Sequence, residues 1–339
     1  MSERAPVPVT VLTGYLGAGK TTLLNRILSE NHGKKYAVVI NEFGELGVDN
    51  DLVVDADEEV FEMNNGCICC TVRGDLIRII GGLMKRKGEL DGIIVETTGL
   101  ADPAPVAQTF FADEDVKRAT RLDAIVTVVD ALNLPARLAD SREAVEQIAF
   151  ADIIVLNKMD LVSPAEADAI EARIRTINAY AEIRRAEKSN VPIDAIIGRE
   201  AFNLERILER EPEFLSGDDD HEHDSEIMSV SFEVERPLDP ERFNAWIQQV
   251  LAHKGQDLLR TKGILAYEKE DRRFAFQAVH MLADGDYIGP WKDGDPRKSK
   301  IVFIGRDLNR PQLRRGFEAC QAGEDVKKIE AEIARWSPA

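Results

Sequence analysis

The sequence predicts an α/β protein with a mainly parallel sheet and helices on both faces, followed by a smaller α+β domain. Short, continuously apolar runs alternate with segments of helical periodicity in the first two thirds of the chain. Such strands are typical of a parallel sheet whose two faces are both covered. An acidic stretch then separates this part from one with a different pattern. We therefore expect domains at residues 1–216 and 227–339, joined by a linker at residues 217–226.

The first strand, Val7–Thr13, leads into a glycine-rich loop and then into a helix. The loop reads Gly-Tyr-Leu-Gly-Ala-Gly-Lys-Thr-Thr and matches G-x-x-x-x-G-K-[ST], the pattern that wraps the phosphates of a nucleotide. Glycines allow backbone N–H groups to approach phosphate oxygens closely, and the following helix N-terminus faces the anion. This strand–loop–helix context makes a chance match a poor explanation. The predicted nucleotide-binding residues of the loop are Gly14, Gly17, Ala18, Gly19, Lys20, Thr21 and Thr22.

Three side chains have predicted roles in phosphoryl transfer by a P-loop NTPase. Lys20 would place its charge on the β- and γ-phosphates, and Thr21 would offer its hydroxyl to Mg²⁺. Glu96 ends a buried strand, where such an enzyme places its acidic, Mg²⁺-associated residue. We predict these three residues to be catalytic. Gly99 gives the loop after Glu96 a hinge that would sense the γ-phosphate.

The remaining elements of the first domain follow from apolar runs and helical spacing. A polar loop after the second strand carries Glu42 and Asp49, which are alternative Mg²⁺ or switch residues, or solvated acids. The other predicted strands and helices lie at residues 36–40, 59–63, 75–85, 93–99, 123–129, 143–150 and 152–156.

A cysteine cluster, Cys67, Cys69 and Cys70, follows the short strand at residues 59–63. Three thiolates this close suit Zn²⁺ or a similar ion. A structural zinc site uses four protein ligands, and no fourth cysteine lies nearby. The site would be completed by an acid, a histidine or water, or left open to a partner, and an open site suits metal transfer. A buried apolar cluster and a redox pair are the alternatives.

The pattern N-K-x-D occurs at Asn157, Lys158 and Asp160, directly after a predicted strand. The Asp160 carboxylate can accept from both N1–H and the exocyclic amine of guanine, a pairing that adenine cannot offer. We predict that these three residues recognise GTP. A second base contact would come from the segment 188–190.

The second domain is predicted to be a small α+β sandwich. Its order is strand 227–234, helix 240–251, strands 263–267 and 273–279 around a polar turn, a loop, strand 301–304 and a closing helix 310–320. His221 and His223 of the acidic linker would either capture divalent cations loosely or be part of a charged linker. Cys320 is expected to be a packed thiol.

Composition excludes several classes of protein. A net charge of −18 argues against a nucleic-acid partner, because phosphates would be repelled. The sequence has no apolar run near the roughly 20 residues that span a bilayer, and no signal-peptide core precedes the first strand. We expect a cytoplasmic protein without a membrane partner.

The motifs as a set resemble those of the CobW-type metal-homeostasis GTPases, relatives of UreG and HypB. The resemblance covers nearly the whole chain and implies a slow GTPase whose nucleotide state is coupled to metal bound at Cys67, Cys69 and Cys70. The resemblance implies zinc as the commonest metal, with cobalt in a branch that serves cobalamin synthesis. Members of that branch often have longer histidine-rich tracts, so a linker with only two histidines favours zinc here. Ile40 stands where some relatives carry a metal-binding acid. The matching segments are residues 14–22, 41–44, 65–70, 96–103, 157–160, 258–265, 277–279 and 302–305.

The predicted function is that of a Mg²⁺-dependent GTPase that acts as a metallochaperone. Zinc is the metal that it is expected to deliver to a client metalloprotein. The client would dock on the switch loops or the C-terminal domain, and metal contacts would come from Thr21 and Glu42 for Mg²⁺ and from the cysteine cluster for the delivered ion. The alternatives are a metal-sensing regulatory GTP-binding protein and a cobalt chaperone for cobalamin synthesis. A GTP-using kinase is a weaker hypothesis, because the sequence indicates no pocket for an acceptor substrate. The sequence defines neither the client nor the oligomeric state.

Overall fold

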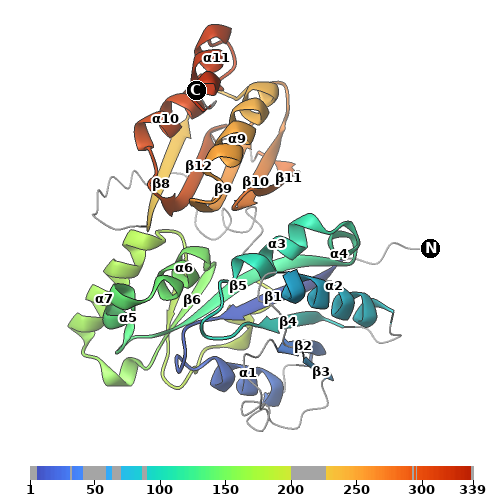
Figure 1. Ribbon diagram of the computed structural model, residues 1–339, viewed down its shortest axis with the longest axis vertical. Helices are drawn as coiled ribbons and strands as arrows, with labels where there is room; N and C mark the ends of the chain where they lie inside the picture. Colours follow the sequence, from blue (N-terminus) through green and yellow to red (C-terminus); the bar gives the residue numbers. More distant parts are fainter. Residues whose placement is uncertain are drawn as a thin grey trace. The chain divides into compact units, whose positions relative to one another are not determined.

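The computed structural model describes residues 6–30, 33–40, 59–62, 70–85, 90–199, 227–291, 294 and 296–336. The chain divides into two compact units, residues 1–175 with 180–202, and residues 176–179 with 203–339. Each unit is built around one sheet (Figure 1). The predicted domain limits at residues 216 and 226 fall outside the described residues.

The sheet of the first unit has seven strands among the described residues, and every pair of neighbours is parallel. Its order is β3-β2-β4-β1-β5-β6-β7, so that β1 lies in the middle and the chain passes to both sides of it. In such a sheet, ligands bind in the crevice outside the carboxyl ends of the central strands. The strands are β1 (Val7–Thr13), β2 (Tyr36–Ile40), β3 (Glu59–Glu62), β4 (Gly92–Glu96), β5 (Thr120–Asp130), β6 (Ile153–Asn157) and β7 (Glu182–Arg185).

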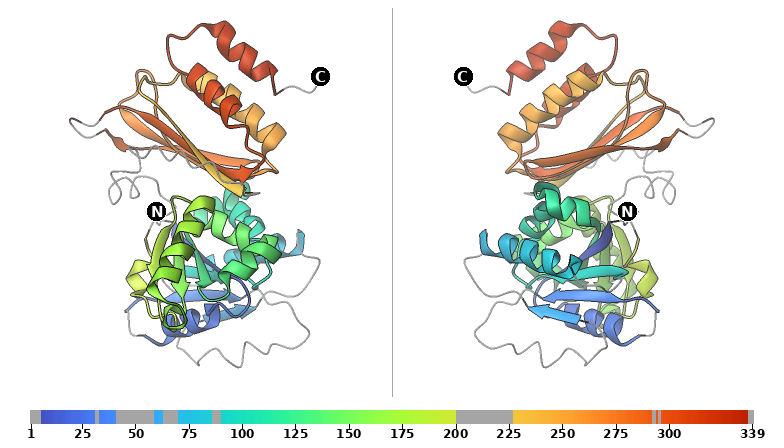
Figure 2. Two further views of the ribbon diagram at one scale, coloured as in Figure 1. Left: turned by 90° about the vertical axis from the view of Figure 1, so that its left-hand side faces the viewer. Right: turned by 90° about the vertical axis from the view of Figure 1, so that its right-hand side faces the viewer.

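Helices cover both faces of this sheet (Figures 1 and 2). The apolar side chains Leu23, Leu24 and Ile27 of α1 pack in one core with strand residues such as Leu12 and Val126. Helices α2 and α3, which contact each other, lie on the opposite face. The predicted α/β class is thus confirmed. The helices are α1 (Lys20–Ser29), α2 (Cys70–Met84), α3 (Ala104–Ala112), α4 (Glu114–Ala119), α5 (Leu134–Asp140), α6 (Arg142–Phe150) and α7 (Pro164–Ile177).

The second unit has a five-stranded sheet in the order β11-β10-β9-β12-β8, with antiparallel neighbours. Alternate residues of β8, Val230, Phe232 and Val234, enter a core that also contains the apolar stripe of α9. Asp239 caps α9 by accepting from Glu241 N at 2.9 Å and Arg242 N at 3.2 Å. The elements are β8 (Ile227–Val234), α9 (Pro240–Lys254), β9 (Leu258–Ala266), β10 (Arg272–Val279), β11 (Leu282–Pro290), β12 (Ser299–Arg306), α10 (Arg310–Ala319) and α11 (Val326–Ala334).

Two details predicted for this unit are wrong. The segment between β10 and β12 was expected to be a loop, but it contains the edge strand β11, which pairs with β10 from Val279↔Leu282 onward. Helix α10 was expected to close the fold, yet α11 follows and packs on α9 and α10.

Cys320, predicted to be a packed thiol, is fully buried and donates from Sγ to Gly316 O at 3.1 Å.

Gly316 of α10 allows a close approach to Trp246 of α9. A Cβ atom at Gly316 would lie 2.1 Å from Trp246 Nε1, so Gly316→Val should destabilise this unit by about 1–3 kcal/mol through overpacking. All three tryptophans of the chain lie in this unit, so denaturant unfolding followed by tryptophan fluorescence measures its stability selectively. Ala245→Val, at an exposed position of α9, is the matched control and should change stability by about 0.5 kcal/mol or less. Equal unfolding midpoints for the two variants would contradict the packing argument.

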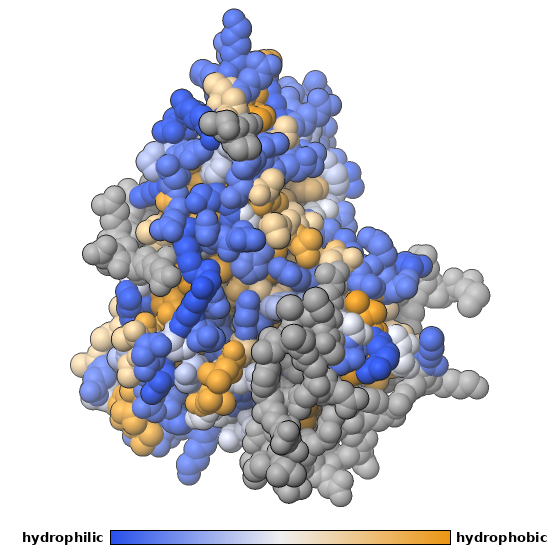
Figure 3. All heavy atoms as spheres, viewed as in Figure 1, coloured by the Kyte–Doolittle hydropathy of each residue, from blue (hydrophilic) through white to orange (hydrophobic). Residues whose placement is uncertain are grey.

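The face of the protein in Figure 3 is mainly hydrophilic, with separate apolar patches. Among the described residues, the exposed large apolar side chains include Leu16 and Leu100, at 60% and 54% exposure. Within the same part of the chain, none of the helices combines the length and apolar character that crossing a membrane requires.

Candidate functional site

The glycine-rich loop follows β1 at the middle of the sheet, and its glycines have close neighbours. Gly14 has φ 141°, and a Cβ atom there would lie 2.2 Å from Val128 O of β5. Gly19 has φ 111°, and a Cβ atom there would lie 2.4 Å from Asn157 Nδ2. These backbone conformations and contacts admit glycine alone, so the loop has one compact path between β1 and α1.

Lys20 is the first residue of α1 and lies folded back over the loop. Its Nζ donates to Gly14 O at 2.7 Å and to Tyr15 O at 3.3 Å, and the residue is 8% exposed. No described side chain caps this helix, and its first turn carries no acidic residue. The first-turn N–H groups and the ammonium group therefore form a cationic end suited to an anion.

A cavity of about 1160 Å³ opens over this helix end. The structure brings Lys20, Thr21 and Glu96, the three predicted catalytic residues, into its lining. Glu96 is 8% exposed and lies at the carboxyl end of β4, where its backbone pairs with Leu12 of β1. The cavity also includes residues of the loop after Glu96 and of α3 and α6. The full lining is Leu16, Gly17, Gly19, Lys20, Thr21, Thr22, Ile40, Glu96, Thr97, Thr98, Gly99, Leu100, Ala101, Asp102, Pro105, Val106, Arg142, Glu143 and Glu146.

Asn157 connects the glycine-rich loop with the segment 188–190. Its Nδ2 donates to Ala18 O at 2.9 Å and to Ser189 Oγ at 3.1 Å, and its Oδ1 accepts from Ser189 N at 2.7 Å. Ser189 Oγ in turn donates to Gly19 O at 3.0 Å. Asn157 is 2% exposed, so its role in the structure is to hold these two loops together. The segment expected to supply a second base contact thus lies beside the phosphate loop.

The other two residues of the N-K-x-D pattern lie at the surface next to Asn157. Lys158 has φ 62° and forms an ion pair with Asp130 at the end of β5, with Nζ and Oδ2 at 2.7 Å. Burial alone would raise the pKa of Asp130, but hydrogen bonds from Lys158 and Asn133 favour the carboxylate, and the net pKa lies below its usual value. Asp160 is exposed in a short 3₁₀ helix, Met159–Leu161, so its carboxylate is accessible to the nucleobase of a ligand.

Three residues that contact the site were not predicted from the sequence. Asp130 orients Lys158, and Arg26 of α1 donates through Nη1 to Ser189 O and to Val191 O, the latter at 3.3 Å. Gln147 of α6 contacts the loop after Glu96. Asp130 could have been found by its position at the end of an apolar strand. Arg26 and Gln147 carry no such signal, because each acts through a partner far away in the sequence.

Several predicted residues lie outside the described part of the chain. These are Glu42, Asp49, Cys67, Cys69 and the linker histidines, whereas Cys70 begins α2. Helix α2 thus starts five residues before the predicted segment at residue 75, since Gly74, a poor helix former, interrupts the helical pattern. Among the described residues, no group of three or more His, Cys, Asp or Glu side chains could hold a metal ion.

The parallel sheet, the glycine-rich loop and the cationic helix end define a P-loop nucleotide-binding protein. Residues 8–185 match the family model for the CobW/HypB/UreG nucleotide-binding domain, and residues 227–321 match that for the cobalamin synthesis protein cobW C-terminal domain. The chain belongs to the CobW/HypB/UreG family of P-loop GTPases. The resemblance seen in its motifs is confirmed.

Similar proteins match over most of their length. The zinc chaperone YjiA of Escherichia coli is 35% identical over 317 residues, which cover 92% of this chain and 98% of YjiA. The zinc-regulated GTPase metalloprotein activator 1 of Schizosaccharomyces pombe is 35% identical, with 90% of this chain and 84% of that protein covered. The crystal structure of Zn(II)-bound YjiA GTPase from Escherichia coli superposes with a TM-score of 0.76 at 31% identity, covering 94% of this chain and all of YjiA.

Proposed function

We propose that this protein hydrolyses GTP to GDP and phosphate and uses the nucleotide state to deliver a divalent transition metal, zinc, to a client metalloprotein. The observation that carries the proposal is the common cavity of Lys20, Thr21, Glu96 and the loop after Glu96. The relatives named zinc chaperone and zinc-regulated GTPase support the choice of metal. Cobalt remains the alternative cargo, because the matching C-terminal domain is named after the cobalamin synthesis protein cobW.

Lys20 and the N-terminus of α1 would bind the β- and γ-phosphates. Lys20 Nζ lies over the loop, where it donates to two carbonyl oxygens. Its charge would stabilise the negative charge that develops on the phosphate oxygens during hydrolysis. Burial of the ammonium group strengthens this interaction, because the cavity excludes part of the surrounding water.

The donor set beside Lys20 fits Mg²⁺. Thr21 supplies a hydroxyl and Glu96 a carboxylate to the same cavity, and hard oxygen ligands of this kind suit Mg²⁺. When bound with GTP, the ion would neutralise phosphate charge. Thr21 and Glu96 would orient it, either directly or through water, and Glu42 is a further proposed ligand.

Guanine would be recognised by Asp160, with Asn157 and Lys158 forming the support. Asn157 holds the phosphate loop and the segment at Ser189 in one arrangement, and Asp130 fixes the direction of Lys158. Asp160 is exposed and would act as the acceptor for the two guanine donors. This arrangement favours GTP over ATP.

The cysteine cluster would bind the delivered metal as thiolates. Ile40, the last residue of β2, lines the nucleotide cavity, and β3 pairs with β2 on its other side. In the chain, β3 precedes the cysteine segment, and α2, which begins at Cys70, follows it. Ile40 pairs with Glu62, the last residue of β3, and Cys67 follows five residues later in the sequence. The client would dock on the switch loops or the C-terminal domain.

One equivalent of Zn²⁺ is expected to change the turnover number or the GTP affinity about fivefold or more, the lower end of typical coupling between two sites. The response should be lost in the triple variant Cys67→Ala, Cys69→Ala and Cys70→Ala. Phosphate release measures turnover, and competition with a chromophoric chelator measures zinc affinity independently. Parallel titrations with Co²⁺ test the alternative metal.

The matched control is Cys320→Ala, which removes the buried thiol of the second unit and leaves the three clustered thiols in place. It should retain the zinc response and the zinc affinity of the unaltered protein. If the unaltered protein and the triple variant respond alike, direct coupling between metal and nucleotide is wrong. If zinc binds at the cluster without any change in turnover or GTP affinity, the metal-sensor hypothesis is favoured over the metallochaperone hypothesis.

A further inference from the structure

The loop from Thr97 to Asp102 lies between β4 and α3 and is fixed at both ends. At its start, Thr97 N donates to Leu12 O at 2.9 Å, and Thr97 Oγ1 donates to Thr13 Oγ1 at 2.8 Å. At its end, Asp102 Oδ1 accepts from Ala104 N at 2.8 Å. The turn between these points lines the nucleotide cavity, so its position determines which contacts the cavity offers to a bound triphosphate.

Gln147 of α6 holds the middle of this loop. Its Nε2 donates to Gly99 O at 3.1 Å and to Ala101 O at 3.2 Å, and the residue is 1% exposed. Two carbonyl acceptors can be satisfied only by the NH₂ group of the amide, which carries two donors. Both donors of Gln147 are therefore directed at the loop, and the side chain spans 46 to 48 residues of sequence.

Helix α6 is itself firmly positioned. Ser141 caps its N-terminus by accepting from Ala144 N at 3.3 Å, and Thr127 Oγ1 of β5 donates to the main-chain oxygen of Gln147 at 2.9 Å. Ile148 and Phe150, which follow Gln147 in the helix, are buried. The amide of Gln147 thus transmits the position of the central sheet to the loop.

On its other side, the loop touches the phosphate loop. A Cβ atom at Gly99 would lie 2.7 Å from both Leu16 N and Leu16 Cδ2. Gly99 is consequently enclosed between the amide of Gln147 and the backbone of Leu16. Since Leu16 adjoins the residues that wrap the phosphates, this contact places the loop directly beside the proposed γ-phosphate position.

We propose that Gln147 is a positioning residue for triphosphate recognition, which holds the Thr97–Asp102 loop against the phosphate loop before GTP binds. The inference rests on the proposed GTPase function. A loop held in place meets the γ-phosphate without a further loss of conformational entropy, whereas a loop released from Gln147 must be ordered at the expense of binding. GDP lacks the γ-phosphate, so its binding does not depend on contacts with this loop. Gln147 therefore sets the preference for GTP over GDP.

The test uses the full chain and compares affinities for GDP and for a non-hydrolysable GTP analogue, measured by titration of fluorescent nucleotides. Gln147→Met removes both donors at similar volume, and Gln147→Asn keeps an amide but withdraws it by one carbon. In both variants the preference for the triphosphate should fall about tenfold, as expected for two lost hydrogen bonds, with GDP affinity nearly unchanged. The turnover number should fall in parallel.

Thr120→Val is the matched control, because it removes another buried hydrogen bond of β5, from Thr120 Oγ1 to Val116 O at 2.9 Å, away from the cavity. It should lower thermal stability while leaving the preference intact. Equal weakening of GDP and the analogue in the Gln147 variants, or an unchanged preference, would overturn the proposal. If one variant does not fold, the other decides. Absence of nucleotide binding by the unaltered protein would refute the GTPase function itself, a result distinct from any change in preference.

Discussion

Replacing Lys20 with alanine is expected to lower the rate of GTP hydrolysis by about 10²- to 10³-fold. The ammonium group of Lys20 is buried at the end of α1 that faces the cavity. The first turn of this helix has no described acidic side chain that would offset its positive charge. Without it, the charge that develops on the phosphate oxygens would be met by the backbone N–H groups and the bound Mg²⁺, with no ammonium group beside them. Phosphate release under saturating GTP measures the rate, and nucleotide titration separates weaker binding from slower chemistry.

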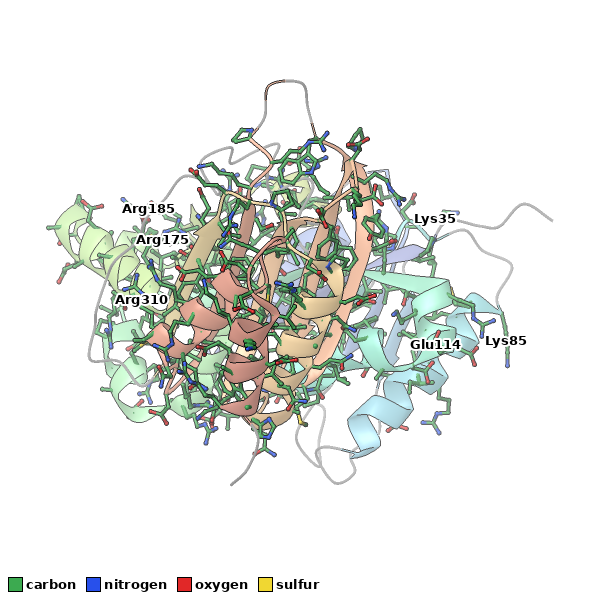
Figure 4. All side chains as sticks on the ribbon, turned by 90° about the horizontal axis from the view of Figure 1, so that it is seen from above. Lys35, Lys85, Glu114, Arg175, Arg185 and Arg310 are labelled. Carbon is green, nitrogen blue, oxygen red and sulfur yellow. The ribbon has the colours of Figure 1, made fainter. Side chains whose placement is uncertain are left out.

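Lys35→Ala is the control for this experiment, since it removes the same charge from an exposed lysine outside the cavity lining, labelled in Figure 4. It should hydrolyse GTP at the rate of the unaltered protein. Normal turnover by the Lys20 variant would remove the basis for assigning phosphoryl transfer to this cavity. A similar loss in both variants would point to net charge rather than to the position of Lys20.

Asp160→Asn should weaken GTP binding by about 10²-fold or more and create affinity for xanthosine triphosphate. The amide presents a donor where the carboxylate accepted two hydrogen bonds from guanine, and an unpaired donor in a recognition site is costly. Xanthine carries a carbonyl oxygen in place of the exocyclic amine and is therefore complementary to the amide. Competition titrations with GTP, ATP and xanthosine triphosphate measure the change in base preference.

Asp168→Asn provides a matched change of charge on α7. Asp168 pairs with Arg185, labelled in Figure 4, with Oδ1 and Nη2 at 2.6 Å, and its side chain is 71% exposed. Exposed ion pairs of this kind contribute little, so this variant should keep the base preference and the stability of the unaltered protein. A GTP preference that survives Asp160→Asn would show that guanine is read elsewhere.

Several elements could be predicted to the residue, because burial dictates their sequence. The strands β1, β2 and β8 have the predicted bounds, since each is a run of apolar residues or a regular alternation between two polar segments. Strand β11 was missed for the opposite reason. It is an edge strand whose residues are mostly exposed, including Ala283, Gly285 and Asp286, and its polar, glycine-containing composition resembles that of a loop. The pairing with β10 forms it, and that pairing is not visible in the sequence.

The candidate site shows the same division. Lys20, Thr21 and Glu96 were predicted because chemistry at a strand end requires particular residue types, and the structure places all three in one cavity. The contacts of Arg26 with Ser189 and of Gln147 with Gly99 could not be predicted. They join residues of ordinary type across 163 and 48 positions of sequence, and only the folded sheet brings the partners together.

The glycines of the phosphate loop differ in what constrains them. Gly14 and Gly19, the two that define the G-x-x-x-x-G-K pattern, are constrained by neighbours within the protein, Val128 O and Asn157 Nδ2, whereas a Cβ atom at Gly17 would meet no described atom within 4 Å. In a descendant that lost its nucleotide, selection for stability would still preserve the first two glycines. Gly17, whose φ of 72° favours glycine but whose added Cβ atom would meet no described neighbour, would be held less strongly. A degenerate copy of this protein would thus keep Gly14 and Gly19 longer than Gly17, and the identity of residue 17 is the better record of an active lineage.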